Sequence, residues 1–296
     1  MVDMGLVGTS MSPADVAAFE AERGRLVAIA YRMLGTVTDA EDVVQDGWLR
    51  WDHLGADGRA AVANPAAWCT TAVTRLALDR LRAAKRQREE YVGPWLPEPV
   101  ATTADPAETV ELAESLTLGF LALLERLNPV ERAAFLLADV FGEPYARIAE
   151  VLGRSEDACR QAASRARRRV REARRGAPPA NAELLLAAFL GACAQGDVDG
   201  LRALLAADVV LVSDGGALVH AARRPVVGAD RVTRLLVNLA KRMPEGLAIE
   251  PVVINGEAGF VGRIGGAPVM VVNVEERAGL ISAVRIMVNP DKLRAV

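Results

Sequence analysis

The sequence predicts a multidomain protein with two all-α parts followed by a C-terminal α+β part. Segments with helical periodicity and capping residues fill the chain up to about Arg175. Runs rich in β-branched residues then dominate the C-terminal third, as expected of antiparallel strands. Proline-rich stretches at 91–107 and 175–181 separate these parts. We therefore expect domains at 12–90, 108–176 and 181–296, with 91–107 as a linker.

The composition is that of a soluble globular protein, because 51% of the 296 residues are hydrophobic and 25% are charged. No apolar run approaches the roughly 20 residues that a membrane span needs, and no secretory signal is evident. The three cysteines are widely spaced and accompany only two histidines. We therefore expect a cytoplasmic protein, monomeric when free, with no disulfide, metal, cofactor or membrane partner.

The first part reads as three helices that begin at capping residues. Ser12 precedes Pro13, "TDAE" (Thr38–Glu41) forms a capping box for a second helix, and Asn64 precedes Pro65 in a third. The outer side of the second helix is acidic and carries one leucine; it consists of Asp42, Gln45, Asp46 and Leu49. Such a face repels DNA and suits a basic protein partner, although an ordinary solvated face has the same pattern.

The third helix and a later helix pair have the character of nucleic-acid surfaces. In the third helix, the side opposite the expected core carries Thr71, Thr74, Arg75, Arg82 and Arg86. Further on, a short helix, a turn at Gly153 and a helix capped by Ser155 form the pattern of a helix-turn-helix. The polar face of its second helix consists of Asp157, Arg160, Gln161, Ser164, Arg165 and Arg168. Arginine, glutamine and serine can contact base edges and phosphates, so we favour DNA binding over a merely solvated basic helix.

The C-terminal part begins with two short helices, a strand in "DVVLVSDGG" and a helix at about 229–241. Four β-rich runs follow, within 247–288. Asp214 and His220 could serve as an acid–base pair if this part were an enzyme. We favour a noncatalytic domain that contacts the helical parts or binds a small ligand.

Together, the segments from Ser12 to Arg175 resemble a bacterial sigma factor of the extracytoplasmic-function (ECF) type. "GTVTDAEDVVQDGWLRW" resembles the region that docks on core RNA polymerase, "NPAAWCTTAVTRLALDRLR" the regions that read the −10 promoter element, and the segment 127–170 the region that reads the −35 element. The resemblance implies that the acidic face binds the β′ clamp helices and that the two basic faces bind the −10 and −35 elements. It also implies contact with the β flap and no enzymatic activity.

The C-terminal part resembles SnoaL-like domains of the NTF2 fold, in which a curved sheet wraps helices into a cone with a pocket. The marks of an ECF subgroup with such a tail, the SigJ-like sigma factors, are present as "WLPEP" (95–99), Asp-Gly-Gly (214–216), "ARRPV" (222–226) and "NPDKL" (289–293). The resemblance implies that the tail regulates sigma activity in cis and that its pocket could hold a small-molecule ligand.

The linker holds apolar residues where a polar connector would be expected. We hypothesise that Trp95 and Leu96, followed by Pro97, dock against the tail near Asn289, Pro290, Asp291, Lys292 and Leu293, with Asp214 as a further regulatory residue. Two alternatives stay open: a ligand-sensing helix-turn-helix regulator that does not join polymerase, and a bifunctional protein whose tail is an isomerase or hydrolase.

Overall fold

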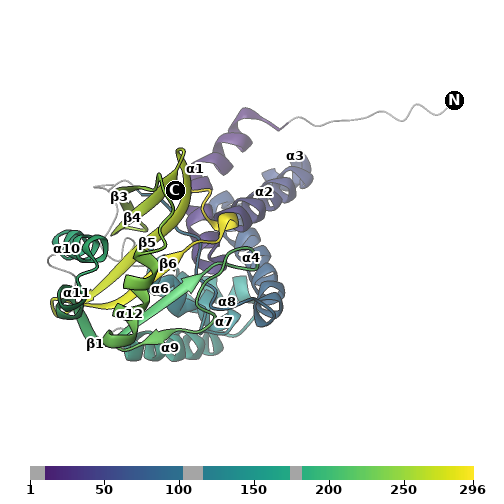
Figure 1. Ribbon diagram of the computed structural model, residues 1–296. Coiled ribbons are helices and arrows are strands. Elements are labelled where there is room, and N and C mark those ends of the chain that lie inside the picture. Colours follow the sequence, from purple (N-terminus) through teal and green to yellow (C-terminus); the bar gives the residue numbers. More distant parts are fainter. Residues whose placement is uncertain (1–10, 103–115, 174–181) are drawn as a thin grey trace. The chain divides into compact units, whose positions relative to one another are not determined.

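The computed structural model describes residues 11–102, 116–173 and 182–296 (Figure 1). The chain divides into two compact units. The first, called the helical unit, comprises Met1–Ala84 and Asn128–Ala166; the second, called the tail unit, comprises Lys85–Leu127 and Arg167–Val296. Among the described residues, no helix is both long enough and apolar enough to cross a membrane.

The helical unit is built from α-helices and one π-helical turn. Its elements are α1 (Pro13–Leu34), α2 (Val37–His53), α3 (Gly55–Ala60), α4 (Pro65–Glu89), α7 (Pro129–Phe135), η1 (Leu136–Val140), α8 (Tyr145–Leu152) and α9 (Glu156–Ala173). The last turns of α4 and the C-terminal part of α9 belong to the tail unit. The expected all-α architecture of the N-terminal parts is therefore confirmed.

Side-chain caps start four of these helices, and those at Ser12, Asn64 and Ser155 lie where the sequence predicted them. Ser12 accepts a hydrogen bond from the backbone of Asp15, and Asn128 forms a complete capping box with Glu131. The capping box expected at Thr38–Glu41 is wrong, because α2 begins two residues earlier and has Thr36 in the N-cap position. The Thr36 hydroxyl donates to the carboxylate of Asp39 instead of capping a backbone N–H.

The tail unit is α+β, as expected. It contains α6 (Leu118–Leu124), α10 (Ala182–Gln195), α11 (Val198–Leu204), β1 (Leu205–Asp214), β2 (Val226–Val227), α12 (Ala229–Ala240), β3 (Ala248–Ile254), β4 (Glu257–Ile264), β5 (Ala267–Arg277), β6 (Leu280–Met287) and the 3-10 turn η2 (Pro290–Lys292). The six strands form one sheet in the order β2-β1-β6-β5-β4-β3. β1 is parallel to β6, and every other neighbouring pair is antiparallel.

Both faces of this sheet are covered. Successive side chains along a strand point to opposite faces, so one strand contributes to the packing on both. On β5, Val272 and Val274 belong to a core that includes residues of α10, α11 and α12. Val271, directly before Val272, points to the opposite face and packs in a smaller cluster with Leu96 and Leu118. The outer face of the sheet is thus covered by the linker and by the start of α6.

By its contacts α6 lies in the tail unit, and the expected domain boundaries stay predictions. The predicted domain at 108–176 would group α6 with the helix-turn-helix, yet α6 lies in the tail unit. Leu118 packs against the outer face of the sheet, and the Asn255 side-chain amide donates to the carbonyl oxygen of Leu116 at 3.0 Å. The expected boundaries at 107, 108, 176 and 181 fall outside the described residues.

Candidate functional site

The acidic side of α2 is exposed, as its sequence pattern predicted. Asp42, Gln45, Asp46 and Leu49 are all accessible to solvent, and Leu49 is 44% exposed. The opposite side of α2 packs so closely on α4 that a Cβ at Gly47 would lie 2.8 Å from Val73. This close approach fixes the orientation of α2 and therefore holds the acidic side outward.

Two features of this surface were not evident in the sequence. Arg80 of α4 donates to Asp39 at 2.8 Å and to Asp42 at 3.0 Å, so one of the four expected docking residues already has a basic partner within the chain. Asp46 and Leu49 border an open hollow of about 490 Å³. Its remaining lining residues are Arg50, His53, Leu54 and Leu76. The hollow gives an apolar partner side chain a place to insert beside the acidic residues.

The basic face of α4 is engaged within the helical unit. Arg75 donates to the carbonyl oxygens of Glu150 and Val151, at 2.8 and 3.0 Å, and so caps the C-terminal end of α8. Thr71 accepts a hydrogen bond from Arg147 of α8 at 2.6 Å.

The remaining residues expected on the basic face of α4 are Thr74, Arg82 and Arg86. The expected outward position of Thr74 is wrong, because Thr74 is fully buried and its hydroxyl has no hydrogen-bond partner among the described residues. Arg82 is exposed and pairs with Asp79 of its own helix at 2.9 Å. The side chain of Arg86 lies outside the described residues.

The predicted helix-turn-helix is present as α8, a left-handed turn at Gly153 and α9. Along α9, the exposed polar residues include Asp157, Gln161, Ser164 and Arg168, as expected. Arg160 is exposed too, but it pairs with Asp157 at 2.9 Å.

Arg165 has a different environment from the rest of this face. Its guanidinium donates to Glu131 at 2.9 Å, and the Glu131 side chain is only 3% exposed. Because a buried carboxylate needs its partner, Arg165 holds α9 to α7 within the helical unit. The sequence pattern had grouped it with the DNA-reading residues.

A buried ion pair of the tail, Asp214 with Lys292, holds the linker through hydrogen bonds within the tail unit. We call linker residues 91–102 the strap. Asp214, at the end of β1, is 1% exposed and accepts three hydrogen bonds that hold the strap in place. The donors are the Tyr91 hydroxyl at 2.6 Å, the Leu96 backbone N–H at 2.9 Å and the Lys292 ammonium at 2.8 Å.

Lys292 contacts the strap from the other side of this pair. Its ammonium also donates to the carbonyl oxygen of Leu96 at 2.7 Å and lies 4.1 Å from the centre of the Trp95 ring. The guanidinium of Arg88 lies 3.6 Å from the same ring. Burial lowers the pKa of Lys292 to about 8, against the opposing attraction of the carboxylate, and burial also raises the pKa of Tyr91.

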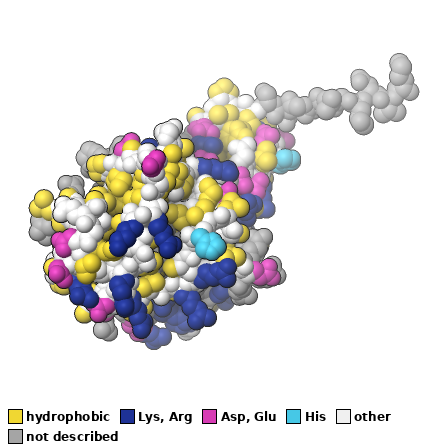
Figure 2. Space-filling model, viewed as in Figure 1, with side chains coloured by type: hydrophobic (Ala, Val, Ile, Leu, Met, Phe, Trp, Pro, Cys, Tyr) yellow, Lys and Arg dark blue, Asp and Glu magenta, His cyan; other side chains and the backbone are white. Residues whose placement is uncertain are grey.

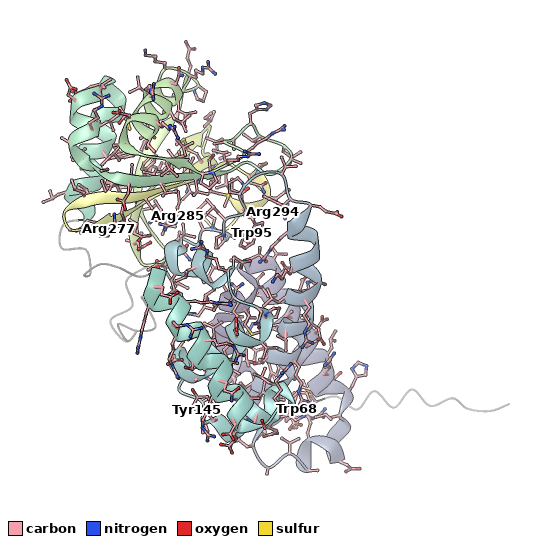
Figure 3. All side chains as sticks on the ribbon, turned by 90° about the horizontal axis from the view of Figure 1, so that it is seen from below. Trp68, Trp95, Tyr145, Arg277, Arg285 and Arg294 are labelled. Atoms are coloured by element: carbon pink, nitrogen blue, oxygen red, sulfur yellow. The ribbon has the colours of Figure 1, made fainter. Side chains whose placement is uncertain are left out.

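Figure 3 shows Trp95 beside the end of the tail that carries Arg294, whereas Arg277 lies at the other end of the sheet. The hypothesised contact of Trp95 and Leu96 with the "NPDKL" segment is therefore present in the free chain. Leu293 of that segment is buried in the same cluster as Leu96.

The strap continues along the sheet after Leu96. Val100 exchanges two hydrogen bonds with Asn255, one from each backbone N–H, and Thr102 N–H donates to the carbonyl oxygen of Val253 at 2.9 Å. Ala101 forms an antiparallel bridge with Ile254 at the end of β3. The strap thus covers the edge of the sheet as a short added strand.

The Asp-Gly-Gly motif allows the close approach of these segments. A Cβ at Gly215 would lie 2.2 Å from the carbonyl oxygen of Val219, and Gly216 has a positive φ of 58° with Asn289 close by. The Asn289 side-chain amide donates to the Tyr91 hydroxyl at 3.0 Å. The exposed Pro290 and Asp291 form the turn η2, which positions Lys292.

Asp214 and His220, the candidate acid–base pair of an enzymatic tail, lie in different environments. Asp214 shares its buried environment with the strap, and His220 is exposed in the following loop. The opposite face of the sheet is packed with side chains that include Phe189, Phe260 and Leu236.

Comparison with known proteins identifies the family. The sigma-70 region 2 model matches residues 18–87, and the sigma-70 region 4 model matches residues 118–170. The chain is 42% identical to the ECF RNA polymerase sigma factor SigJ of Mycobacterium tuberculosis, over 94% of this chain and 93% of SigJ. It is also 33% identical to the probable ECF sigma factor SigI of the same species, over 94% of this chain and 96% of SigI.

The structure agrees with this relationship. The crystal structure of Mycobacterium tuberculosis SigJ matches with a TM-score of 0.77 and 38% identity, over 95% of this chain and 99% of that one. The match therefore extends through the α+β tail as well as both helical parts. The chain belongs to the ECF RNA polymerase sigma factors and directs transcription initiation at promoter DNA with core RNA polymerase.

Proposed function

We propose that the exposed side of α2 docks on the β′ clamp helices, that α4 reads the −10 element, and that α9 reads the −35 element. We further propose that the tail regulates these steps by holding the strap in the free chain. The observation that carries this regulatory part is the buried pair of Asp214 and Lys292, whose members bind the N–H and the carbonyl oxygen of one strap residue, Leu96.

Strap release has a large energetic threshold. Hydrogen bonds to charged groups contribute about 1.5–3 kcal/mol each, and Tyr91 and Leu96 of the strap make three of them with Asp214 and Lys292. Pulling the strap away removes contacts from both members of the pair and also uncovers Leu96, Ile254 and Met287. Core polymerase must therefore supply an alternative environment for the apolar strap when the two promoter-binding regions separate.

The −10 surface is also engaged in the free chain. Arg75 and Thr71 contact α8, so α4 cannot offer these side chains to DNA until the contacts with α8 are broken. Polymerase binding, strap release and exposure of the −10 surface are, in this proposal, successive parts of one activation.

A pull-down with core polymerase tests the docking surface. Leu49→Glu introduces a charge beside the hollow at an exposed position, so it should abolish polymerase binding and run-off transcription without changing the thermal unfolding midpoint. Leu184→Glu is the matched control, since Leu184 is 72% exposed in α10 of the tail. Normal polymerase binding by Leu49→Glu would refute the assignment of this face.

The alternatives from the sequence receive no comparable support. A repressor-like regulator does not need the exposed acidic face of α2, whereas the proposed docking on core polymerase gives that face a role. An enzymatic tail would need Asp214 to be available to a substrate, but this carboxylate is held by the strap and Lys292. The proposal accordingly includes neither a reaction nor a ligand in the tail.

A further inference from the structure

One side of the tail carries an excess of basic side chains that the strap does not use. Between residues 215 and 246, the acidic residues are Asp230 and Glu245. The basic residues of the same segment are Arg223, Arg224, Arg231, Arg234, Lys241 and Arg242, and all are exposed. Figure 2 shows dark blue side chains gathered on the face of the tail unit that carries α12.

The helix α12 aligns most of these charges. Its buried residues are Val232, Thr233 and Leu236, which pack toward the sheet. At about 100° per residue, Arg231, Arg234, Asn238 and the two basic residues that follow the helix lie within an arc of roughly 100° on the opposite side. With a rise of about 1.5 Å per residue, the stripe from Arg231 to Arg242 is about 16 Å long.

The stripe is not neutralised by neighbouring carboxylates. In the part of the chain that the structure describes, no ion pair involves Arg231, Arg234, Lys241 or Arg242. The acidic residue on α12, Asp230, is paired with Arg202 of α11 at 2.7 Å.

Arginines elsewhere on the tail have local partners. Arg263 pairs with Glu250 at 3.0 Å, Arg277 with Asp208, and Arg294 with Asp291 at 3.8 Å. An ordinary solvated surface interleaves both signs of charge in this way, so the unpaired stripe on α12 requires a different explanation.

We propose that this stripe, Arg231 to Arg242, binds the phosphate backbone of DNA. Arginine and lysine on an exposed helix face make the sequence-independent contacts that position proteins on a duplex. The tail would then be a third DNA-binding surface, besides α4 and α9, and would add affinity without adding base specificity. This inference does not depend on the strap or on its release.

The test is the salt dependence of binding to a promoter duplex, measured by fluorescence anisotropy with the full chain. The variant combines Arg231→Gln, Arg234→Gln and Arg242→Gln. The matched control combines Arg263→Gln, Arg277→Gln and Arg294→Gln, which changes the net charge equally at positions that already have acidic partners.

If three phosphate contacts are lost, the slope of log K against log salt becomes less steep by about 2.7. Between 50 and 200 mM salt, wild-type affinity should therefore fall by about 40-fold more than that of the α12 variant. The loss should be equal on promoter and scrambled duplexes, and the control should behave as the wild type. Equal effects of both variants would overturn the proposal, as would an unchanged slope. If the α12 variant bound DNA normally but bound core polymerase more weakly, the stripe would be a protein-binding surface, and the proposal would be overturned.

Discussion

Asp214 is the position where one substitution should free the strap. Its carboxylate accepts hydrogen bonds from Tyr91, Leu96, Gly216 and Lys292, and Asp214→Ala removes all four acceptor contacts at once. Lys292, which is 6% exposed, is then left without a carboxylate in a desolvated site, where it must either stay charged or release its proton, and both cost free energy. This penalty applies only while the strap is docked, because Lys292 is solvated once the strap has left the tail.

The magnitude follows from the cost of an unpaired buried charge. A loss of about 3–5 kcal/mol shifts the docking equilibrium of the strap by about 100- to 4,000-fold, at 1.4 kcal/mol per factor of ten. A buried ion pair replaced by neutral groups costs far less than one broken at a single partner. Asp214→Ala combined with Lys292→Met should therefore recover much of the docking that Asp214→Ala loses.

Hydrogen exchange at the Leu96 amide measures this equilibrium directly, because that N–H donates to Asp214 in the docked strap. The Asn255 amide, which donates to Val100, reports the same opening in all four proteins of the double-mutant cycle. Removal of Asp214 also removes the Leu96 acceptor, so protection at Asn255 is the decisive readout. The amide of Val284, in the central strand β6, serves as the control for global unfolding.

Two results would refute this reasoning. Unchanged exchange at Asn255 in Asp214→Ala would mean that the ion pair does not hold the strap. Strictly additive effects of the two single substitutions would mean that Asp214 and Lys292 do not act as a pair; the account predicts a coupling of about 1–3 kcal/mol.

Three further predictions concern protonation and packing. The pKa of Lys292 is about 8 when the strap is docked, compared with 10.5 for an ordinary lysine. Between these pH values the protein with an undocked strap binds more protons, so docking should strengthen as pH rises from 8 to 9.5. Exchange at Asn255, corrected for intrinsic rates, should show this trend in the wild type but not in Lys292→Met. Arg165→Ala should lower the free energy of unfolding by about 1–2 kcal/mol, because Glu131 stays buried without this partner; chemical denaturation measures the loss, and an unchanged midpoint would contradict it. Burial raises the pKa of the Cys69 thiol to about 11, so iodoacetamide at pH 8 should alkylate this thiol only after denaturation. Mass spectrometry measures the modification, and alkylation of Cys69 in the native protein would contradict the prediction.

The local elements of this fold could be predicted because their signals lie within a few residues of one another. The caps at Ser12 and Asn64, the turn at Gly153 and the strand β5, rich in β-branched residues, each follow from short-range pattern. Thr74 shows the limit of helical periodicity. A helix face that periodicity marks as outward is buried when another segment of the unit covers it.

The strap contact depends on residues far apart in the chain. Tyr91 and Asp214 are separated by 123 positions, and Leu96 and Lys292 by 196. No spacing rule connects such residues, and the contact of Trp95 and Leu96 with "NPDKL" was suggested by the apolar character of the linker together with the resemblance to a tailed sigma subgroup. The role of Lys292 as the donor to both Asp214 and the strap required coordinates, as did the placement of α6 with the tail.

The most direct test of the account is to lock the strap to the tail with a disulfide. Ala101 and Ile254 form an antiparallel bridge whose neighbours carry the hydrogen bonds, so their Cα atoms are expected about 4.5 Å apart, within the disulfide range. Run-off transcription with core polymerase would compare Ala101→Cys, Ile254→Cys and the double variant under oxidising and reducing conditions. The account predicts that the oxidised double variant fails to initiate and that reductant restores its activity, with both single variants active throughout. Initiation by the oxidised double variant at the rate of its reduced form would contradict the claim that the strap must leave the tail.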